Sequence, residues 1–402
     1  MKPDAYAWKA IGASIVGYAM DGFDLLILGF ALPAITAEFG LSPVQAGSLA
    51  TITLVGAVLG GFVGGIASDY IGRVRVLTYS IVVFAVFTGL TGLAPDFVSL
   101  AIFRFIAGIG LGAEFGVGMT LAAEAWPARM RARATSYVAL GWQLGVLLAA
   151  VVSAVAIPLI GWRGLFLIGV LPAIVAAFVR HGVDEPELFK KKIAARTGKR
   201  QGPSPLAMLF STPQAFKSSI AMITLTSVQN FGYYGVMIWL PSYLATRYEM
   251  SLTQSAVWTG VTIVGMAAGI WVFGALADRY GRRPILIIFQ VGAVASVLGY
   301  SQLSDPTALL IGGAVMGVFV NGMMGGYGAL MAELYPTQAR ATAQNVLFNI
   351  GRGVGGFGPI VVGAAALALG FPGAIALLAA IYLLDIVVTV FLIEERKGAE
   401  LQ

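Results

Sequence analysis

Long apolar runs separated by short polar connections make up most of this chain. A helix needs about 20 predominantly apolar residues to cross the roughly 30 Å of hydrocarbon in a bilayer. Such runs occur at residues 10–37, 44–68, 76–94, 97–125, 134–160, 164–180, 218–245, 252–276, 284–302, 306–332, 341–368 and 371–393. Because lipid offers no partners for backbone N–H and C=O groups, the runs predict helices. The pattern therefore predicts an all-α membrane protein with twelve transmembrane helices.

The longest polar segment lies in the middle of the chain, at residues 182–217. It divides the twelve runs into two sets of six. We therefore predict an N-terminal six-helix bundle over residues 1–181, a central cytoplasmic loop over 182–217 and a C-terminal six-helix bundle over 218–402.

The two sets of runs repeat each other at a fixed spacing. A shift of 209 residues carries Asp69 onto Asp278 and Arg73 onto Arg282. The same shift relates Gly65 to Gly274, Gly72 to Gly281, Glu124 to Glu333, Pro127 to Pro336 and Arg131 to Arg340. Chance agreement is the alternative, but it does not account for charged residues and prolines that match at one offset. The repeat predicts two bundles related by pseudo-twofold symmetry, an arrangement in which transporters hold substrate between the halves near the membrane midplane.

Composition agrees with a membrane location. Of the 402 residues, 58% are hydrophobic and 11% are charged, whereas soluble domains have about 45–50% apolar and about 25% charged residues. The chain has no cysteine and one histidine, which excludes disulfides, thiol chemistry and a zinc site built from these residues. We expect no metal and no cofactor.

The distribution of positive charge indicates the orientation. Lys and Arg gather at both termini and at every second connection, as at Arg73, Arg75 and the stretch 180–217. Such residues favour the cytoplasmic side of the inner membrane, so we predict that both termini are cytoplasmic. The net charge of +6 is thus a topology signal, and we expect no nucleic-acid partner.

Two connections carry a recognisable motif. The segment 64–75 reads GGIASDYIGRVR, and its repeat at 274–283 reads GALADRYGRR. Both resemble the Gly-x-x-x-Asp-x-x-Gly-Arg signature of the major facilitator superfamily, and the fourth run resembles the second motif of that superfamily from Arg104 to Gly112. The resemblance covers essentially the whole chain. It implies that Asp69, Arg73, Asp278 and Arg282 are gating residues that latch the outward-facing state.

The first run carries a more specific motif. It reads DGFDLLILGFALPAI at residues 21–35, which resembles the aromatic-acid:proton symporter family. The chain departs from that family at Ile350, which breaks the spacing of its glycines, and after the sixth run, which reads VDEPELF. The resemblance implies proton-coupled uptake of an aromatic acid. A symporter of another carboxylate, such as lactate or sialate, and a proton-driven exporter are the alternatives.

Several ionisable residues lie inside the predicted spans, where each costs about 2.5–3.5 kcal/mol at a helix centre. They are Asp21, Asp24, Arg104, Glu114, Arg352 and Asp385. A rise of about 1.5 Å per residue places Asp24 nearer to Arg104, so we predict that Asp24 carries the proton and that Arg104 is its switchable partner. A permanent structural ion pair is the alternative.

Asp21 and Glu114 complete the predicted proton-coupling set. Asp21 lies one turn before Asp24, and we interpret it as a second proton site or a gate; the alternative is a hydrogen-bonded acid that lines the cavity. We predict that Glu114 shares or relays that proton; the alternative is that helix packing holds it neutral.

Arg352 is the predicted ligand of the substrate. It lies about 18 Å beyond Arg340 along its helix, near the midplane, and a guanidinium can bind a carboxylate with two parallel hydrogen bonds. The alternative is pairing with an acid of the first helix. The other candidate substrate-binding residues are polar or aromatic and lie in neighbouring spans: Trp142, Gln143, Asn230, Tyr233, Tyr234, Asn321, Asn345 and Asn349. Packing is the alternative role for each of them.

Other classes of function lack support. The glycines of 353–358 match a dinucleotide-binding pattern, but no strand precedes them and they lie in an apolar span. No phosphate-binding loop and no catalytic constellation is evident. We therefore expect a monomeric secondary transporter, and not an enzyme, whose partners are the bilayer, protons and a small organic acid.

Overall fold

The computed structural model describes residues 3–41, 43–171, 174, 185, 204–248 and 252–397. Within those ranges every regular element is a helix. Most of the predicted central loop, residues 186–203, lies outside the described residues.

The first half consists of α1 (Ala5–Phe39), α2 (Pro43–Ile71), α3 (Arg73–Thr91), α4 (Phe97–Gly112), α5 (Glu114–Ala125), the short 3₁₀ helix η1 (Ala128–Met130) and α6 (Arg131–Ile168). The second half consists of α9 (Pro205–Met208), α10 (Pro213–Arg247), α11 (Leu252–Tyr280), α12 (Arg282–Ser301), α13 (Pro306–Gly322), α14 (Met324–Leu334), α15 (Arg340–Gly355) and α16 (Gly358–Leu392). Apart from η1, which lies between two runs, and α9, which lies in the predicted central loop, each helix is close to one of the predicted apolar runs or to part of one.

Three of the predicted spans are broken near their middles. The fourth span is interrupted at Ala113, between α4 and α5, and the tenth at Met323, between α13 and α14. The eleventh span passes from α15 into α16. Conversely, α6 and α16 each continue through a glycine with positive φ, at Gly161 and Gly370, so that each of these helices joins two predicted spans.

The turns between α2 and α3 and between α11 and α12 depend on glycine. Gly72 and Gly281 have φ of 117° and 107°, a region that side-chain-bearing residues rarely adopt. These are the glycines of the repeated motif. The backbone conformation of the two turns therefore explains why the motif contains glycine at this position.

Nine helices among the described residues are long and apolar enough to cross a membrane. Neither α10 nor α15 is among them. Polar side chains lower their hydropathy, at Gln229 and Asn230 in α10 and at Asn345, Asn349 and Arg352 in α15. α15 has only 16 residues, which already makes it short for a membrane span. Of the two helices, only α10 is long enough and still too polar.

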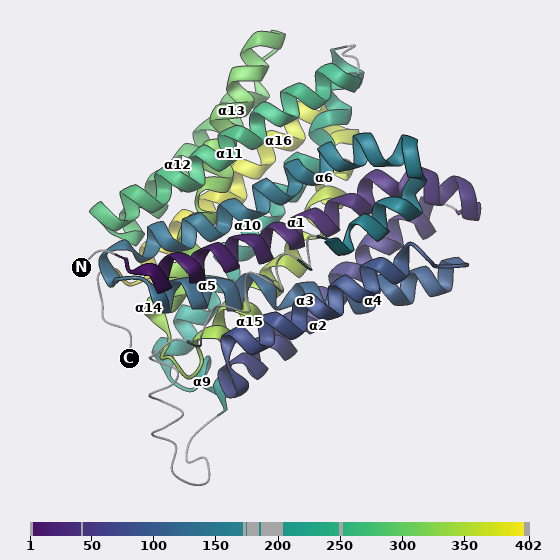
Figure 1. Cartoon of the computed structure of the whole chain (residues 1–402). Coiled ribbons are helices and arrows are strands. Elements are labelled where there is room, and N and C mark those ends of the chain that lie inside the picture. Colours follow the sequence, from purple (N-terminus) through teal and green to yellow (C-terminus); the bar gives the residue numbers. More distant parts are fainter. Residues whose placement is uncertain are drawn as a thin grey trace.

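Both termini lie at the same end of the bundle, which we call the N/C end; the opposite end is the distal end (Figure 1). Contacts between the halves are made by α2, α5 and α6 with α11, α14 and α15. The halves lie close together at the N/C end and diverge toward the distal end (Figure 1).

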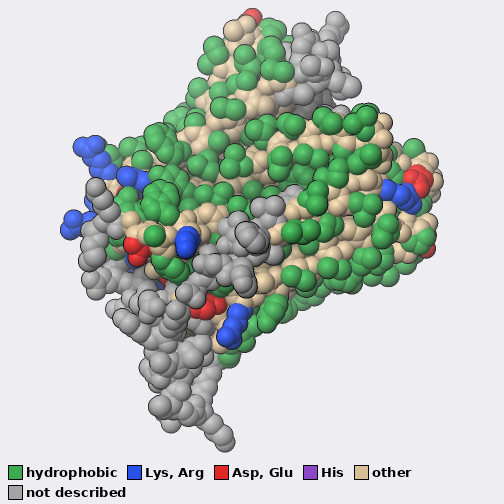
Figure 2. All heavy atoms as spheres, viewed as in Figure 1, with side chains coloured by type: hydrophobic (Ala, Val, Ile, Leu, Met, Phe, Trp, Pro, Cys, Tyr) green, Lys and Arg blue, Asp and Glu red, His purple; other side chains and the backbone are tan. Residues whose placement is uncertain are grey.

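The outer surface is apolar around the middle of the bundle. Figure 2 shows hydrophobic side chains over the helices and charged ones gathered at the two ends. On α6, Leu147, Val151 and Val155 follow one another at four-residue spacing with 59%, 58% and 60% of their surface exposed. Such a continuous apolar face belongs in lipid.

Glycines allow the two halves to approach closely at the N/C end. A Cβ added to Gly65 of α2 would lie 2.7 Å from the Cβ of Asn345 on α15, and one added to Gly274 of α11 would lie 2.3 Å from the Oγ of Ser136 on α6. Both positions belong to the 209-residue repeat. The two halves therefore meet here through helix backbones.

Candidate functional site

A cavity lies between the two halves. Its lining comes from α1, α6, α10, α13, α14 and α15: Tyr18, Ala139, Trp142, Gln143, Gln229, Asn230, Tyr233, Tyr234, Asn321, Met324, Phe348 and Arg352. The predicted residues Trp142, Gln143, Asn230, Tyr233, Tyr234, Asn321 and Arg352 are all in this lining. The cavity is thus polar and aromatic, with one cation.

Arg352 is loosely held in the cavity wall. Its Nη1 lies 3.6 Å from Oδ2 of Asp21, across the interface between α15 and α1. Its guanidinium lies 5.4 Å from the ring centroid of Trp142, and Tyr234 lies beside it. Among the described residues, Nη2 of Arg352 and both carboxylate oxygens of Asp21 have no hydrogen-bond partner. Both groups therefore have hydrogen-bonding capacity to offer a ligand.

Asp24 and Arg104 form a much tighter pair inside the first half. Nη2 of Arg104 lies 2.8 Å from Oδ2 of Asp24, and Nη1 lies 3.2 Å from Oδ1. Thr88 donates a hydrogen bond to the same carboxylate, and Nε of Arg104 donates to Thr53 at 3.3 Å. All four side chains are buried. The helix depths correctly predicted this pair, and its role as a switch stays a prediction.

Glu114 begins α5, directly after the break at Ala113, and it is buried. It lies close enough to Asp21 for their charges to interact. Within the described part of the chain, no three His, Asp or Glu side chains gather as a metal site would require.

Stacked aromatic rings close the cavity toward the N/C end. Phe115 of α5 and Phe348 of α15 stack across the two halves with ring centroids 3.7 Å apart and an interplanar angle of 23°. Phe348 is one helical turn from Arg352. Trp142 of α6 donates from Nε1 to the hydroxyl of Tyr233 on α10 at 3.2 Å, which adds a polar contact across the halves.

Two predicted residues lie outside the cavity lining. Nδ2 of Asn349 donates to the carbonyl of Gly112 at 3.2 Å and to the carbonyl of Asn345 at 2.9 Å. Asn345 packs against Gly65 and Gly116 of the first half. Both asparagines join α15 to the first half instead of facing the cavity, because their depth places them where the halves are in contact.

The sequence did not single out Tyr18, Gln229, Met324 or Phe348 as lining residues. Tyr18 lies three residues before Asp21, so helical spacing gives both one face. Gln229 adjoins Asn230, and its Nε2 donates to Oδ1 of Asn321 at 2.7 Å. Apolar lining residues such as Phe348 carry no sequence signal that separates them from core residues.

The N/C end is closed by two charge networks, which follow the sequence repeat. The first network comprises Asp69, Arg73, Glu124 and Arg340. Arg73 contacts Asp69 at 2.9 Å and Glu124 at 3.4 Å, and Arg340 of the other half contacts Glu124 at 2.6 Å. Asp69 accepts a hydrogen bond from the backbone N–H of Thr342 at 2.9 Å, near the start of α15, where the helix dipole favours a carboxylate.

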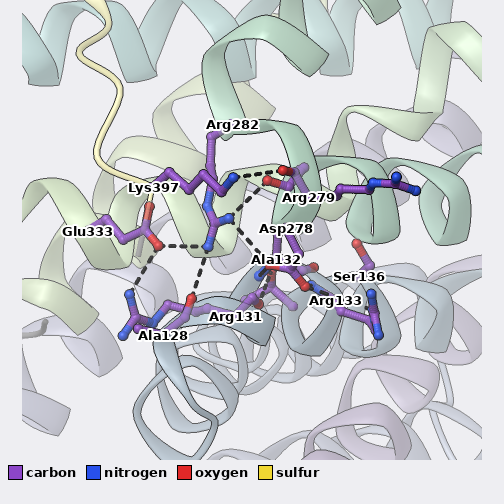
Figure 3. Close-up of polar contacts among 12 residues, drawn as sticks. Ala128, Arg131, Ala132, Arg133, Ser136, Asp278, Arg279, Arg282, Glu333 and Lys397 are labelled. Atoms are coloured by element: carbon purple, nitrogen blue, oxygen red, sulfur yellow. Dashed lines mark hydrogen bonds and ion pairs between the residues drawn. The ribbon is translucent and has the colours of Figure 1, made fainter. Parts of the chain in front are cut away.

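The second network comprises Asp278, Arg282, Glu333 and Arg131. Figure 3 shows Arg282 between Glu333 and Ala128, and Asp278 facing the start of α6. Arg282 contacts Asp278 at 3.3 Å and Glu333 at 2.9 Å, and Arg131 of the first half contacts Glu333 at 3.0 Å. Asp278 accepts from the backbone N–H of Ala132 at 3.0 Å and of Arg133 at 3.1 Å.

A glutamate after the last helix of each half supports these networks from outside. Glu185 accepts hydrogen bonds from the backbone N–H groups of Arg73 and Val74, at 2.8 and 2.9 Å. Glu395 accepts from Arg283 N–H at 2.8 Å. Burial raises the pKa of Glu185, and the hydrogen bonds from the start of α3 oppose that rise.

A second arginine at the distal end resembles Arg352 in its surroundings but lies outside the cavity. Nη1 of Arg163 lies 2.6 Å from Oε1 of Glu38 on α1, and its guanidinium lies 4.2 Å from the ring centroid of Trp162. Each arginine therefore combines an acid of α1 with a tryptophan, which makes Arg163 a natural control for Arg352.

Comparisons with known proteins identify the family to which this architecture belongs. The family model described as Major Facilitator Superfamily matches residues 14–299 and 250–402. The "Putative metabolite transport protein" of Haemophilus influenzae is 59% identical over 100% of this chain and 99% of its own length. The "Cis,cis-muconate transport protein" of Acinetobacter baylyi is 31% identical over 89% of this chain and 88% of its own.

A solved structure of the proton:xylose symporter XylE matches with a TM-score of 0.82 at 18% identity, and covers 99% of this chain and 98% of that one. The predicted fold, with two six-helix halves, is thereby confirmed. Because the family and the curated relatives are transporters, the protein is a transporter and not an enzyme. The chain belongs to the major facilitator superfamily.

Proposed function

We propose that this transporter takes up a small organic acid together with protons, by alternating access. One observation carries the proposal: the cavity between the halves contains Arg352, whose Nη2 has no hydrogen-bond partner among the described residues. A carboxylate satisfies such a guanidinium better than a neutral ligand does, because ionised hydrogen bonds are shorter and stronger.

The shape of the lining favours a flat, conjugated acid. Trp142, Tyr18, Tyr233 and Tyr234 offer ring faces, and aromatic groups gain from offset or edge-on contact with a second π-system. Amide groups of Gln143, Gln229 and Asn230 remain to bind hydroxyl or carbonyl substituents. The muconate-transporting relative carries a conjugated acid as well.

Proton coupling follows from competition for Arg352. Asp21 is the charged partner of Arg352 at 3.6 Å, so a substrate carboxylate that binds Arg352 displaces Asp21. A buried carboxylate without a cationic partner is unfavourable. Asp21 therefore takes up a proton, which the nearby Glu114 can share. Asp24 takes up a proton when its pair with Arg104 opens during the movement between the halves.

The N/C end faces the cytoplasm in this proposal, because Arg73, Arg131, Arg282 and Arg340 lie there. The closed charge networks then correspond to a state that is shut toward the cytoplasm. Since the chain has no cysteine, a single cysteine near either terminus is a clean label for testing this orientation in whole cells.

Uptake into proteoliposomes with an imposed inward proton gradient tests the function. Labelled benzoate-like, muconate-like, lactate-like and sialate-like acids are compared for wild type and Asp24→Asn. Gradient-dependent accumulation of a conjugated acid that the variant loses supports the proposal. Preference for lactate or sialate revises the substrate, and efflux driven by the opposite gradient overturns uptake in favour of export. Accumulation that persists in Asp24→Asn moves the coupling to Asp21.

A further inference from the structure

A second buried acid lies in the C-terminal half, away from the cavity and without a cation. Asp385 of α16 has no exposed surface, and among the described residues neither of its carboxylate oxygens has a hydrogen-bond partner. No salt bridge reaches it within the described ranges. This contrasts with Asp21 and Asp24, each of which faces an arginine.

The side chains beside Asp385 are neutral. Gln290 of α12 lies next to it, and Nε2 of Gln290 donates to Oγ1 of Thr389 at 2.7 Å. Neither group carries a positive charge, so neither compensates the charge of a buried carboxylate.

The remaining neighbours do not supply a counter-charge. Tyr382, one turn earlier on α16, and Tyr327 of α14 are the titratable groups that interact with Asp385. Arg283 of α12 donates to the carbonyls of Thr389 and Val390 on α16, about one turn closer to the N/C end than Asp385. An ionised carboxylate in such surroundings would cost so much free energy that the group takes a proton instead.

The two tyrosines connect Asp385 to α10, which lines the cavity. Tyr327 donates from its hydroxyl to the carbonyl of Leu225 at 3.2 Å. The hydroxyl of Tyr382 lies against Gly232, where an added Cβ would be only 2.0 Å from it, and that hydroxyl has no partner among the described residues. Leu225 and Gly232 are two turns apart on one face of α10, and Tyr233 of the cavity follows directly.

We propose that Asp385 is a second proton-binding site, which carries a proton in the conformation seen here and releases it when α10 moves relative to α16. Movement of α10 away from Tyr382 opens the cluster to water, where a carboxylate is stable. Asp385 lies seven residues, or about 10 Å, before the end of α16 at Leu392, and it is not among the residues that line the cavity.

Infrared spectroscopy of the purified protein in lipid nanodiscs tests whether the proton is present. We expect wild type at neutral pH to show the C=O stretching band of a protonated carboxylic acid, and Asp385→Asn to lose it. Asp24→Asn is the matched control, since it removes a buried aspartate that is paired with Arg104, and the Asp385 band should remain. This measurement needs no substrate, so its outcome is independent of the proposed function.

Substrate exchange across proteoliposomes tests the release. Asp385→Asn imitates the permanently protonated acid, so we expect exchange to slow by about tenfold, which corresponds to about 1.4 kcal/mol. Its pH profile should change, because only Asp21 and Asp24 then remain to titrate. If the band is absent in wild type, or if Asp385→Asn exchanges at the wild-type rate with the wild-type pH profile, the proposal is wrong. If Asp385→Asn does not fold, Gln290→Leu replaces it: loss of the amide beside Asp385 must shift the band in frequency, and an unshifted band overturns the assignment.

Discussion

The two ion pairs that α1 makes are built very differently. Asp24 and Arg104 are joined by two hydrogen bonds, of 2.8 and 3.2 Å, and both receive further support from threonines. Asp21 and Arg352 are 3.6 Å apart, and the Asp21 oxygens have no hydrogen-bond partner among the described residues. The first pair lies within one half and the second spans both halves. The comparison indicates that the Asp24–Arg104 pair stays closed until the conformation changes. In the Asp21–Arg352 pair, by contrast, a ligand can take the place of Asp21.

The largest effect is expected from Asp24→Asn. It leaves the buried charge of Arg104 uncompensated, and breaking a buried pair in this way typically costs about 3–5 kcal/mol of stability. Thermal unfolding in detergent measures it. The double variant Asp24→Asn with Arg104→Gln should recover most of the loss; if the double variant is no more stable than the single one, the pair does not stabilise the half as described.

Arg352→Ala should weaken binding without a comparable loss of stability. Hydrogen bonds to charged groups contribute about 1.5–3 kcal/mol, so we expect the KM for uptake to rise about tenfold to a hundredfold. The matched control is Arg163→Ala, which removes an arginine with an α1 acid and a tryptophan at the distal end. Equal effects of the two substitutions on KM would show that Arg352 has no special role.

Asp21→Asn should strengthen binding under conditions in which wild-type Asp21 is ionised. It removes the competitor for Arg352, and a coupling free energy of about 1 kcal/mol gives an affinity gain of about fivefold. Substrate binding measured at acidic and alkaline pH should become independent of pH in the variant. A pH dependence identical to that of wild type would exclude Asp21 as the competing acid.

The most local effect is expected from Thr88→Val, which removes one hydrogen bond to Asp24. A hydrogen bond to a charged group predicts a loss of about 1.5 kcal/mol of stability, with binding unchanged. Thr91→Val serves as control, because Thr91 bonds only the carbonyl of Phe87 within its own helix, at 2.7 Å. If both valine variants lose the same stability, the tight pair does not depend on Thr88.

The fold could be predicted from the sequence because lipid imposes long apolar helices and the 209-residue repeat relates the halves. Counting helical rise was also enough to bring Asp24 to Arg104. Pairing of Arg352 with an acid of the first helix was only the alternative to its role as a ligand, and it is the contact that Arg352 makes with Asp21. Helical rise could not select Asp21, because the contact depends on how the two halves dock, which no local pattern encodes. Asn349 is a similar case: its polarity suggested a ligand, but the docking of α15 against Gly112 occupies its amide.

Hydropathy alone does not identify every membrane-spanning helix of this chain. Length and hydropathy together identify nine spans among the described residues and omit α10, which carries Asn230 and is long but polar, and α15, which carries Arg352 and has only 16 residues. A cavity wall faces water or substrate on one side, so it needs fewer apolar residues than a helix surrounded by lipid. A weak span between strong ones is therefore itself a signal of the binding site.

The glycine contacts between the halves set a steric limit on transport. Gly65 and Gly274 let α2 and α11 rest almost directly on α15 and α6, and no large side chains interlock at these two points. At these two points the halves can therefore separate without withdrawing a large side chain, whereas the Phe115–Phe348 stack and the charge networks must open as well. The same close contact makes the closed state sensitive to a larger side chain. Gly65→Leu would clash with Asn345 of α15 and hold the protein open at its N/C end.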